Sequence, residues 1–63
     1  MNNLEKCRKE AKLSQEKLAK LSGVSRNTIS QIERGIHVNV TRGIMKSLSA
    51  VLEKPVEHIF FDK

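Results

Sequence analysis

Four side chains suited to reading nucleic-acid bases lie close together in the middle of this 63-residue chain. Arg26 can donate two hydrogen bonds to guanine, and Asn27 and Gln31 can each donate to and accept from adenine. Ser30 stands beside them in the sequence. An ordinary solvated helix face carries the same residue types, so the interpretation depends on the segment that presents them.

That segment has the pattern of a short helix. Ser25 is a good N-cap, because its side-chain oxygen can accept from a free N–H group of the first turn. The helix is expected to run to about Arg34, with Gly35 at its C-terminal stop. Ile29 and Ile32 form its buried side. The four polar residues then fall on the opposite, outward face.

A second short helix is expected immediately before it. Ser14 can cap this helix, and Gly23 can end it in a left-handed conformation. Leu18 is expected to face inward, and Leu21 at least partly so. Two short helices joined by a tight turn form a helix-turn-helix, here over residues 14–34.

Three further helices are predicted, over residues 3–12 and 40–52 and from Pro55 onward. Asn2 or Asn3 can cap the first of these. Apolar residues recur at every fourth position of the 40–52 segment, at Val40, Ile44, Leu48 and Leu52. Such spacing predicts a continuous buried stripe. With no strand or hairpin signal, the fold class is all-α with five helices in one domain.

The charge is unevenly spread along the chain. The net charge is +5, and residues 1–46 carry ten Lys and Arg against four Glu, a balance of +6. Residues 47–63 carry two Lys against three acidic residues. This division suggests one side that faces a polyanion and another with a different use, although a merely solvated surface would look similar. A chain this short can hardly enclose a deep substrate cleft, which argues against an enzyme.

The remaining composition narrows the function classes further. One cysteine, Cys7, excludes an intrachain disulfide and is expected to be a core thiol. Cys7, His37 and His58 lie in three segments without zinc spacing, so no metal, cofactor or small-molecule ligand is expected. No apolar run is long enough for a membrane span, and no signal peptide is evident. We therefore expect a cytoplasmic protein.

The segment from Gln15 to Arg34 resembles the helix-turn-helix of the phage Cro and repressor family, also called the Xre family. The flanking helices are similar in layout, so the resemblance covers nearly the whole chain. It implies a five-helix, lambda-repressor-like DNA-binding domain. The residues that carry it are Gln15, Leu18, Ala19, Gly23, Val24, Ser25, Ile29, Ile32, Glu33 and Gly35.

Members of this family bind double-stranded DNA as symmetric dimers, and the resemblance assigns roles to individual residues. Arg8 and Glu33 match an ion pair that joins the first and third helices. This pair is expected to be structural. The positions that match base readers are Arg26, Asn27 and Gln31, with Ser30 as a weaker candidate.

Other positions match contacts to the DNA backbone. Gln15 matches a phosphate-binding position at the start of the second helix. The loop after the third helix departs from the family pattern, since Ile36 and Val38 stand where polar or basic residues often grip phosphate. Arg42 is a possible substitute for them. Further phosphate candidates are Ser14, Thr28 and Arg34.

Three consecutive apolar residues near the C-terminus cannot all face one small core. Phe61 follows Ile59 and Phe60, and a frayed, partly exposed tail would explain it. We favour a dimer contact at Phe61, because exposed apolar patches on small domains often mark interfaces. The near-neutral C-terminal region agrees with a homodimer formed there.

The first hypothesis for function is a transcriptional regulator, a repressor, that binds a palindromic operator through the major groove. The chain begins just before the first helix and ends just after the fifth, so we expect it to be complete without an effector domain. The alternative is an antitoxin or similar interaction module that uses this fold to mask a partner protein. A toxin-like neighbouring gene or a tight protein complex would distinguish the alternative.

Overall fold

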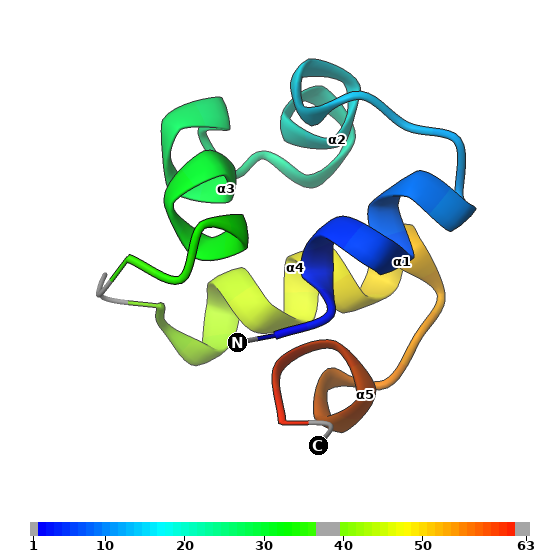
Figure 1. Ribbon diagram of the computed structural model, residues 1–63, viewed down its shortest axis with the longest axis vertical. Coiled ribbons are helices and arrows are strands. Elements are labelled where there is room, and N and C mark those ends of the chain that lie inside the picture. The colour runs from blue at the N-terminus through cyan, green and yellow to red at the C-terminus, as the bar shows by residue number, and fades with distance from the viewer. Residues whose placement is uncertain (1, 37–39, 62–63) are drawn as a thin grey trace.

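Five helices make up the part of the chain that the computed structural model describes, residues 2–36 and 40–61. This arrangement confirms the expected all-α, five-helix fold class. In Figure 1, α4 crosses the middle of the molecule, with α2 and α3 on one side of it and α5 on the other. The helices are α1 (Leu4–Glu10), α2 (Gln15–Ser22), α3 (Arg26–Glu33), α4 (Arg42–Leu52) and α5 (Val56–Phe60).

Side-chain caps set where the two central helices begin. The hydroxyl of Ser14 accepts a hydrogen bond from the N–H of Lys17, and the hydroxyl of Ser25 accepts one from the N–H of Thr28. Each bond satisfies one of the free N–H groups of a first helical turn. Both helices therefore start where the sequence predicts. Gly23 ends α2 with a φ of 77°, in the left-handed region.

The helices on either side of the helix-turn-helix, α1 and α4, are shorter than expected. The prediction that the first helix continues to residue 12 is wrong, because Lys12 adopts a left-handed φ of 60°. The N–H of Leu13 closes instead on the carbonyl of Arg8, which turns the chain toward α2. The prediction that the fourth helix starts at residue 40 is also wrong. Thr41 caps α4 by accepting from the N–H of Ile44, so the helix begins after it.

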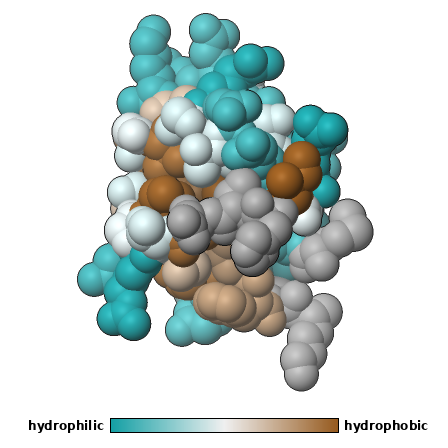
Figure 2. Space-filling view, turned by 90° about the vertical axis from the view of Figure 1, so that its left-hand side faces the viewer, coloured by the Kyte–Doolittle hydropathy of each residue, from teal (hydrophilic) through white to brown (hydrophobic). Residues whose placement is uncertain are grey.

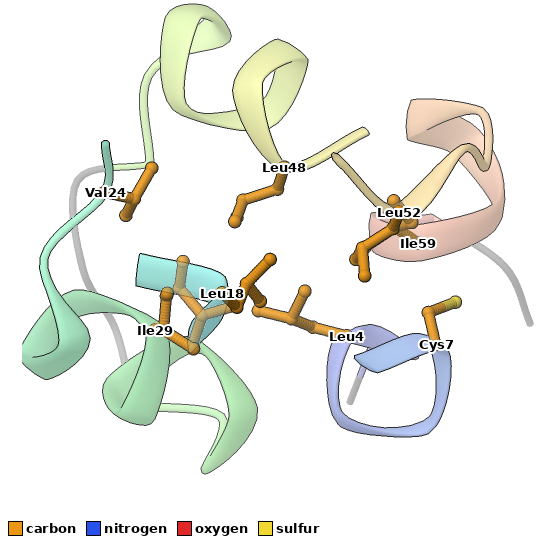
Figure 3. Close-up of a cluster of buried hydrophobic side chains, with 9 residues drawn as sticks. Leu4, Cys7, Leu18, Val24, Ile29, Leu48, Leu52 and Ile59 are labelled. Atoms are coloured by element: carbon orange, nitrogen blue, oxygen red, sulfur yellow. The ribbon is translucent and has the colours of Figure 1, made fainter. Parts of the chain in front are cut away.

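The core gathers side chains from all five helices and from the turn between α2 and α3. Figure 3 shows these side chains converging from the surrounding helices. Cys7 is among them, and the thiol occupies the place of a small hydrophobe. Ile29 and Ile32 fix the inward side of α3. The buried apolar residues are Leu4, Cys7, Leu18, Val24, Ile29, Ile32, Leu48, Leu52 and Ile59.

The expectation that Leu21 faces partly inward is wrong, since its residue surface is 54% exposed. The inward face of α2 runs through Leu18, Ala19 and Ser22, which are buried or half-buried. At 100° per residue, Leu21 lies well to one side of that face and near the exposed Lys17. Leu21 therefore contributes little to the core.

Gly23 and Gly43 test whether each position needs the conformational freedom of glycine. Gly23→Ala should lower the free energy of unfolding by about 1 kcal/mol, because an alanine resists the left-handed φ even though nothing crowds its Cβ. Gly43→Ala should raise it by about 0.8 kcal/mol, because Gly43 lies inside α4 and the new Cβ meets only the Thr41 hydroxyl, at 3.7 Å. Urea unfolding measures both. Shifts of the same sign in the two variants would contradict this description of the turn.

Candidate nucleic-acid interface

One face of α3 is polar and open to solvent. Arg26 and Asn27 are exposed in its first turn, whereas Ser30 and Gln31 are half-buried one turn later. Ile29 lies on the opposite face and is completely buried. The structure therefore places all four sequence-predicted base readers on one helix, whose opposite face is buried in the core. An arginine, a carboxamide and a second carboxamide along such a face can match the hydrogen-bonding edges of base pairs.

The start of α3 holds a pair of hydroxyl groups. Ser25 Oγ accepts from the backbone N–H of Thr28 and lies 2.8 Å from Thr28 Oγ1. The pairing holds the Thr28 hydroxyl next to the free N–H groups of the helix N-terminus. That end of a helix favours negative charge, so Thr28 is well placed for a phosphate oxygen.

The start of α2 is bound to the end of α3. Gln15 Nε2 donates a hydrogen bond to Glu33 Oε1 over 2.9 Å. A carboxamide nitrogen carries two hydrogens, so the second hydrogen and the amide oxygen of Gln15 remain for another partner. The same side chain can therefore contact a phosphate while it fixes the angle between the two helices. Ser14, the other candidate at this end, is exposed.

A charged pair lies behind both helices. Arg8 Nε donates to Glu33 Oε2 over 2.6 Å, and Arg8 Nη2 donates to Glu33 Oε1 over 3.2 Å. Arg8 Nη1 donates to the carbonyl of Leu13 over 2.7 Å. Arg8 is only 9% exposed, so these partners replace most of its contact with water. The structure thus contains the ion pair that joins α1 to α3. We call this group of Arg8, Leu13, Gln15 and Glu33 the polar hub.

The polar hub raises the pKa of the Arg8 guanidinium. The hydrogen bond to Glu33 raises the pKa of Arg8 above its usual value, against the lowering effect of burial. The negative charges of Glu33 and Glu5 raise it further. Because an arginine pKa already lies far above neutrality, the guanidinium stays charged throughout the accessible pH range. The α1–α3 link is therefore always a full ion pair on the arginine side.

The other candidate residues lie at helix ends. Arg34 is the C-cap of α3, and Arg42 is the first residue of α4. Both are exposed, as is Ile36 after α3. Val38 and His37 lie outside the described residues. Within residues 2–36 and 40–61, no three His, Cys, Asp or Glu side chains form a group that could hold a metal ion.

Comparison with known proteins agrees with this geometry. The chain matches the helix-turn-helix family over residues 4–59, a span that runs from the start of α1 into α5. The chain belongs to this Xre-like helix-turn-helix family. It is also 42% identical over 53 residues to the HTH-type transcriptional regulator SlrR of Bacillus subtilis (strain 168). That alignment covers 84% of this chain and 35% of SlrR, so the chain spans about a third of the length of this relative.

Family membership shows a helix-turn-helix domain, and the relative is described as a transcriptional regulator. In the parts of the chain that the structure describes, none of the helices has the length and apolar character needed to cross a bilayer.

Sequence reasoning missed some of the contacts in the polar hub. The resemblance assigned Gln15 to phosphate alone and gave no indication of its hydrogen bond to Glu33. The carbonyl of Leu13 was not identified as a partner of Arg8. Backbone carbonyls carry no sequence signal, and the approach of Gln15 to a residue 18 positions away depends on how the two helices cross.

Removing the carboxylate of the hub should destabilise the fold strongly. Glu33→Ala should lower the free energy of unfolding by about 3 kcal/mol, because it leaves the buried charge of Arg8 without its partner. Thermal and urea unfolding would measure the loss. The control is Arg8→Met combined with Glu33→Met, which removes both charges and should recover much of the loss. A double variant as unstable as Glu33→Ala would contradict this account.

Proposed function

We propose that this helix-turn-helix protein is a sequence-specific DNA-binding transcriptional regulator that places α3 in the major groove. The observation that carries the proposal is the polar face of α3, opposite Ile29 and Ile32 on the buried side. The major groove is wide enough for an α-helix and presents a distinct pattern for each base pair. Such a helix can therefore select a sequence.

In this proposal the N-terminal half of α3 reads the bases. Arg26 and Asn27 are the most exposed of the candidates, and the N-terminal residues of a recognition helix are those that contact base edges. Arg26 donates to guanine O6 and N7. Asn27 and Gln31 pair with adenine N6 and N7, and Ser30 adds a weaker contact.

Phosphate contacts surround this reading face and supply most of the affinity. Thr28 and Gln15 approach the DNA backbone from the starts of α3 and α2. The net charge of +5 favours a polyanion, and binding should weaken steeply with salt as counterions are released. Ser14, Arg34 and Arg42 provide the remaining contacts.

A homodimer completes the proposal. Phe61 is 63% exposed at the C-terminal end of α5, beyond the half-buried Phe60. Figure 2 shows brown surface at mid-height and tan surface lower on one face, with teal residues above them and along the lower edge. A second copy packed on such a surface would place two recognition helices about 34–36 Å apart, one turn of duplex, and would select a palindromic operator.

Within this proposal the regulator acts as a repressor. Repression needs only that the protein occupy a site which the transcription machinery must use, and DNA binding by two α3 helices achieves this. Activation requires an additional surface that contacts the machinery. The relative is described as a transcriptional regulator, which supports the class of function.

Selection of bound sites from a random DNA library tests the reading face. The full chain should enrich a palindrome with half-sites about ten base pairs apart. On the enriched site, Arg26→Ala or Gln31→Ala should each cost about 1–3 kcal/mol of binding free energy and relax selection at one base pair. Arg42→Ala is the matched control for phosphate contact, because Arg42 is exposed and lies outside the polar hub, and it should weaken all sequences alike. Equal losses on every sequence for all three variants would refute the assigned roles, and no enrichment would refute sequence-specific binding.

The dimer surface has its own test. Phe61→Ser should shift the protein toward monomer in sedimentation velocity, because it removes an exposed apolar side chain from the contact. Leu21→Ser is the matched control, since Leu21 is the comparably exposed apolar residue on α2. The control should leave the oligomeric state unchanged. If neither variant changes the sedimentation coefficient, or if the control alone does, Phe61 is not at the interface.

A further inference from the structure

The two residues before α1 connect the ends of two other helices. Asn2 Nδ2 donates to the carbonyl of Ile32 in α3 over 2.9 Å. Asn3 Nδ2 donates to the carbonyl of His58 over 3.0 Å, and the Asn3 backbone N–H donates to the carbonyl of Ile59 over 2.8 Å. We call Asn2 and Asn3 together the N-terminal clasp. In Figure 1 this segment lies between α3 and α5.

The clasp binds carbonyls at the C-terminal ends of two helices, and one of them, the Ile32 carbonyl, also accepts from the N–H of Gly35. The last four carbonyls of any α-helix lack a partner within the helix. Ile32 belongs to the last turn of α3, and His58 and Ile59 belong to the last turn of α5. The clasp therefore holds the C-terminal ends of both helices from one short piece of backbone.

The side chain of Asn2 is oriented by a second bond. Its Oδ1 accepts from the N–H of Leu4 over 3.0 Å, and so it caps the start of α1. Asn3, the residue at the N-cap position, makes no such cap bond, and its amide is directed to α5. A serine or aspartate would also cap α1. The amide of Asn2 has its acceptor and its donor on two separate atoms, so Oδ1 accepts from α1 while Nδ2 donates to α3.

The clasp joins two helices that do not pack closely against each other. α1 packs against both of them, whereas α3 and α5 are not among the closely packed helix pairs. Packing connects the two helices through α1 and through the pair of α2 and α4, and the clasp adds direct hydrogen bonds at the start of α1. Directional hydrogen bonds constrain rotation and sliding, which apolar packing alone permits more freely.

We propose that Asn2 and Asn3 are positioning residues that make α3 and α5 move as one body. This proposal rests on the proposed function in one respect: a dimer paired near Phe61 would transmit its geometry to α3 through the clasp. The clasp would then determine how strictly the protein demands one spacing between half-sites. Neither residue needs to touch DNA for this effect.

The first arm of the test uses the full chain without DNA. Residual dipolar couplings from the amides of α3 and α5 should fit one alignment tensor in the wild-type protein. In the variant with Asn2→Ala and Asn3→Ala, the α5 couplings should shrink relative to those of α3. Leu48→Val is the matched control, because it weakens the core at α4 and leaves the clasp intact. If the double variant does not fold, the same couplings are measured in Asn2→Ala and in Asn3→Ala. Each single variant removes the side-chain bond to only one of the two helices.

The second arm measures the consequence for DNA. Operators with the selected half-site spacing, and with one base pair more or fewer, are compared with a single half-site. The clasp variants should bind the single half-site like the wild-type protein. Their preference for the selected spacing should fall by roughly fivefold or more, as expected for a lost coupling between two sites. The Leu48→Val control should keep the preference.

The outcomes separate this proposal from the proposed function. Double-variant couplings that still fit one tensor at full amplitude would overturn the clasp as a rigid link, whatever the DNA results. An unchanged spacing preference, or an equal loss on the single half-site, would overturn its positioning role. Wild-type protein that ignores half-site spacing would refute the proposed dimeric binding mode and, with it, the clasp's role in spacing. The couplings would still decide whether α3 and α5 move together.

Discussion

The buried ion pair between Arg8 and Glu33 is the interaction on which the rest of the structure depends. It joins α1 to α3 with two hydrogen bonds, the shorter of them 2.6 Å long. The same carboxylate accepts from Gln15, and the same guanidinium donates to Leu13. Three helices and one connecting loop therefore meet at one set of charges. A small domain buries limited apolar surface. Directional contacts such as these therefore help to fix how its helices are oriented relative to one another.

The two faces of α3 have different roles: one fixes the helix in the fold, and the other presents polar side chains to solvent. Ile29 and Ile32 bury one face, and the polar hub fixes the C-terminal end through Glu33. The outward face is then free to carry Arg26 and Asn27, which contribute nothing to the core. The proposed function follows from this separation, since base readout requires polar groups that are presented from a helix whose position does not vary.

Local signals predicted the starts of α2 and α3 better than the end of α1 and the start of α4. Ser14 and Ser25 were identifiable as caps because capping depends on neighbours three residues away. The end of α1 was not predictable, because Lys12 takes a left-handed conformation that its residue type does not favour. The bond between Gln15 and Glu33 depends on helix crossing, which sequence patterns do not encode. The Arg8–Glu33 pair also depends on how the helices cross. Residue types alone therefore did not predict it, and the family resemblance did.

Methylation interference on the selected operator tests the central claim most directly. Dimethyl sulfate methylates guanine N7 in the major groove and adenine N3 in the minor groove. The account predicts that methylated guanine N7 within each half-site blocks the wild-type protein, and that Arg26→Ala loses this sensitivity at one guanine. Interference confined to adenine N3 would contradict the placement of α3 in the major groove, and unchanged guanine sensitivity in Arg26→Ala would contradict the assignment of a guanine to Arg26.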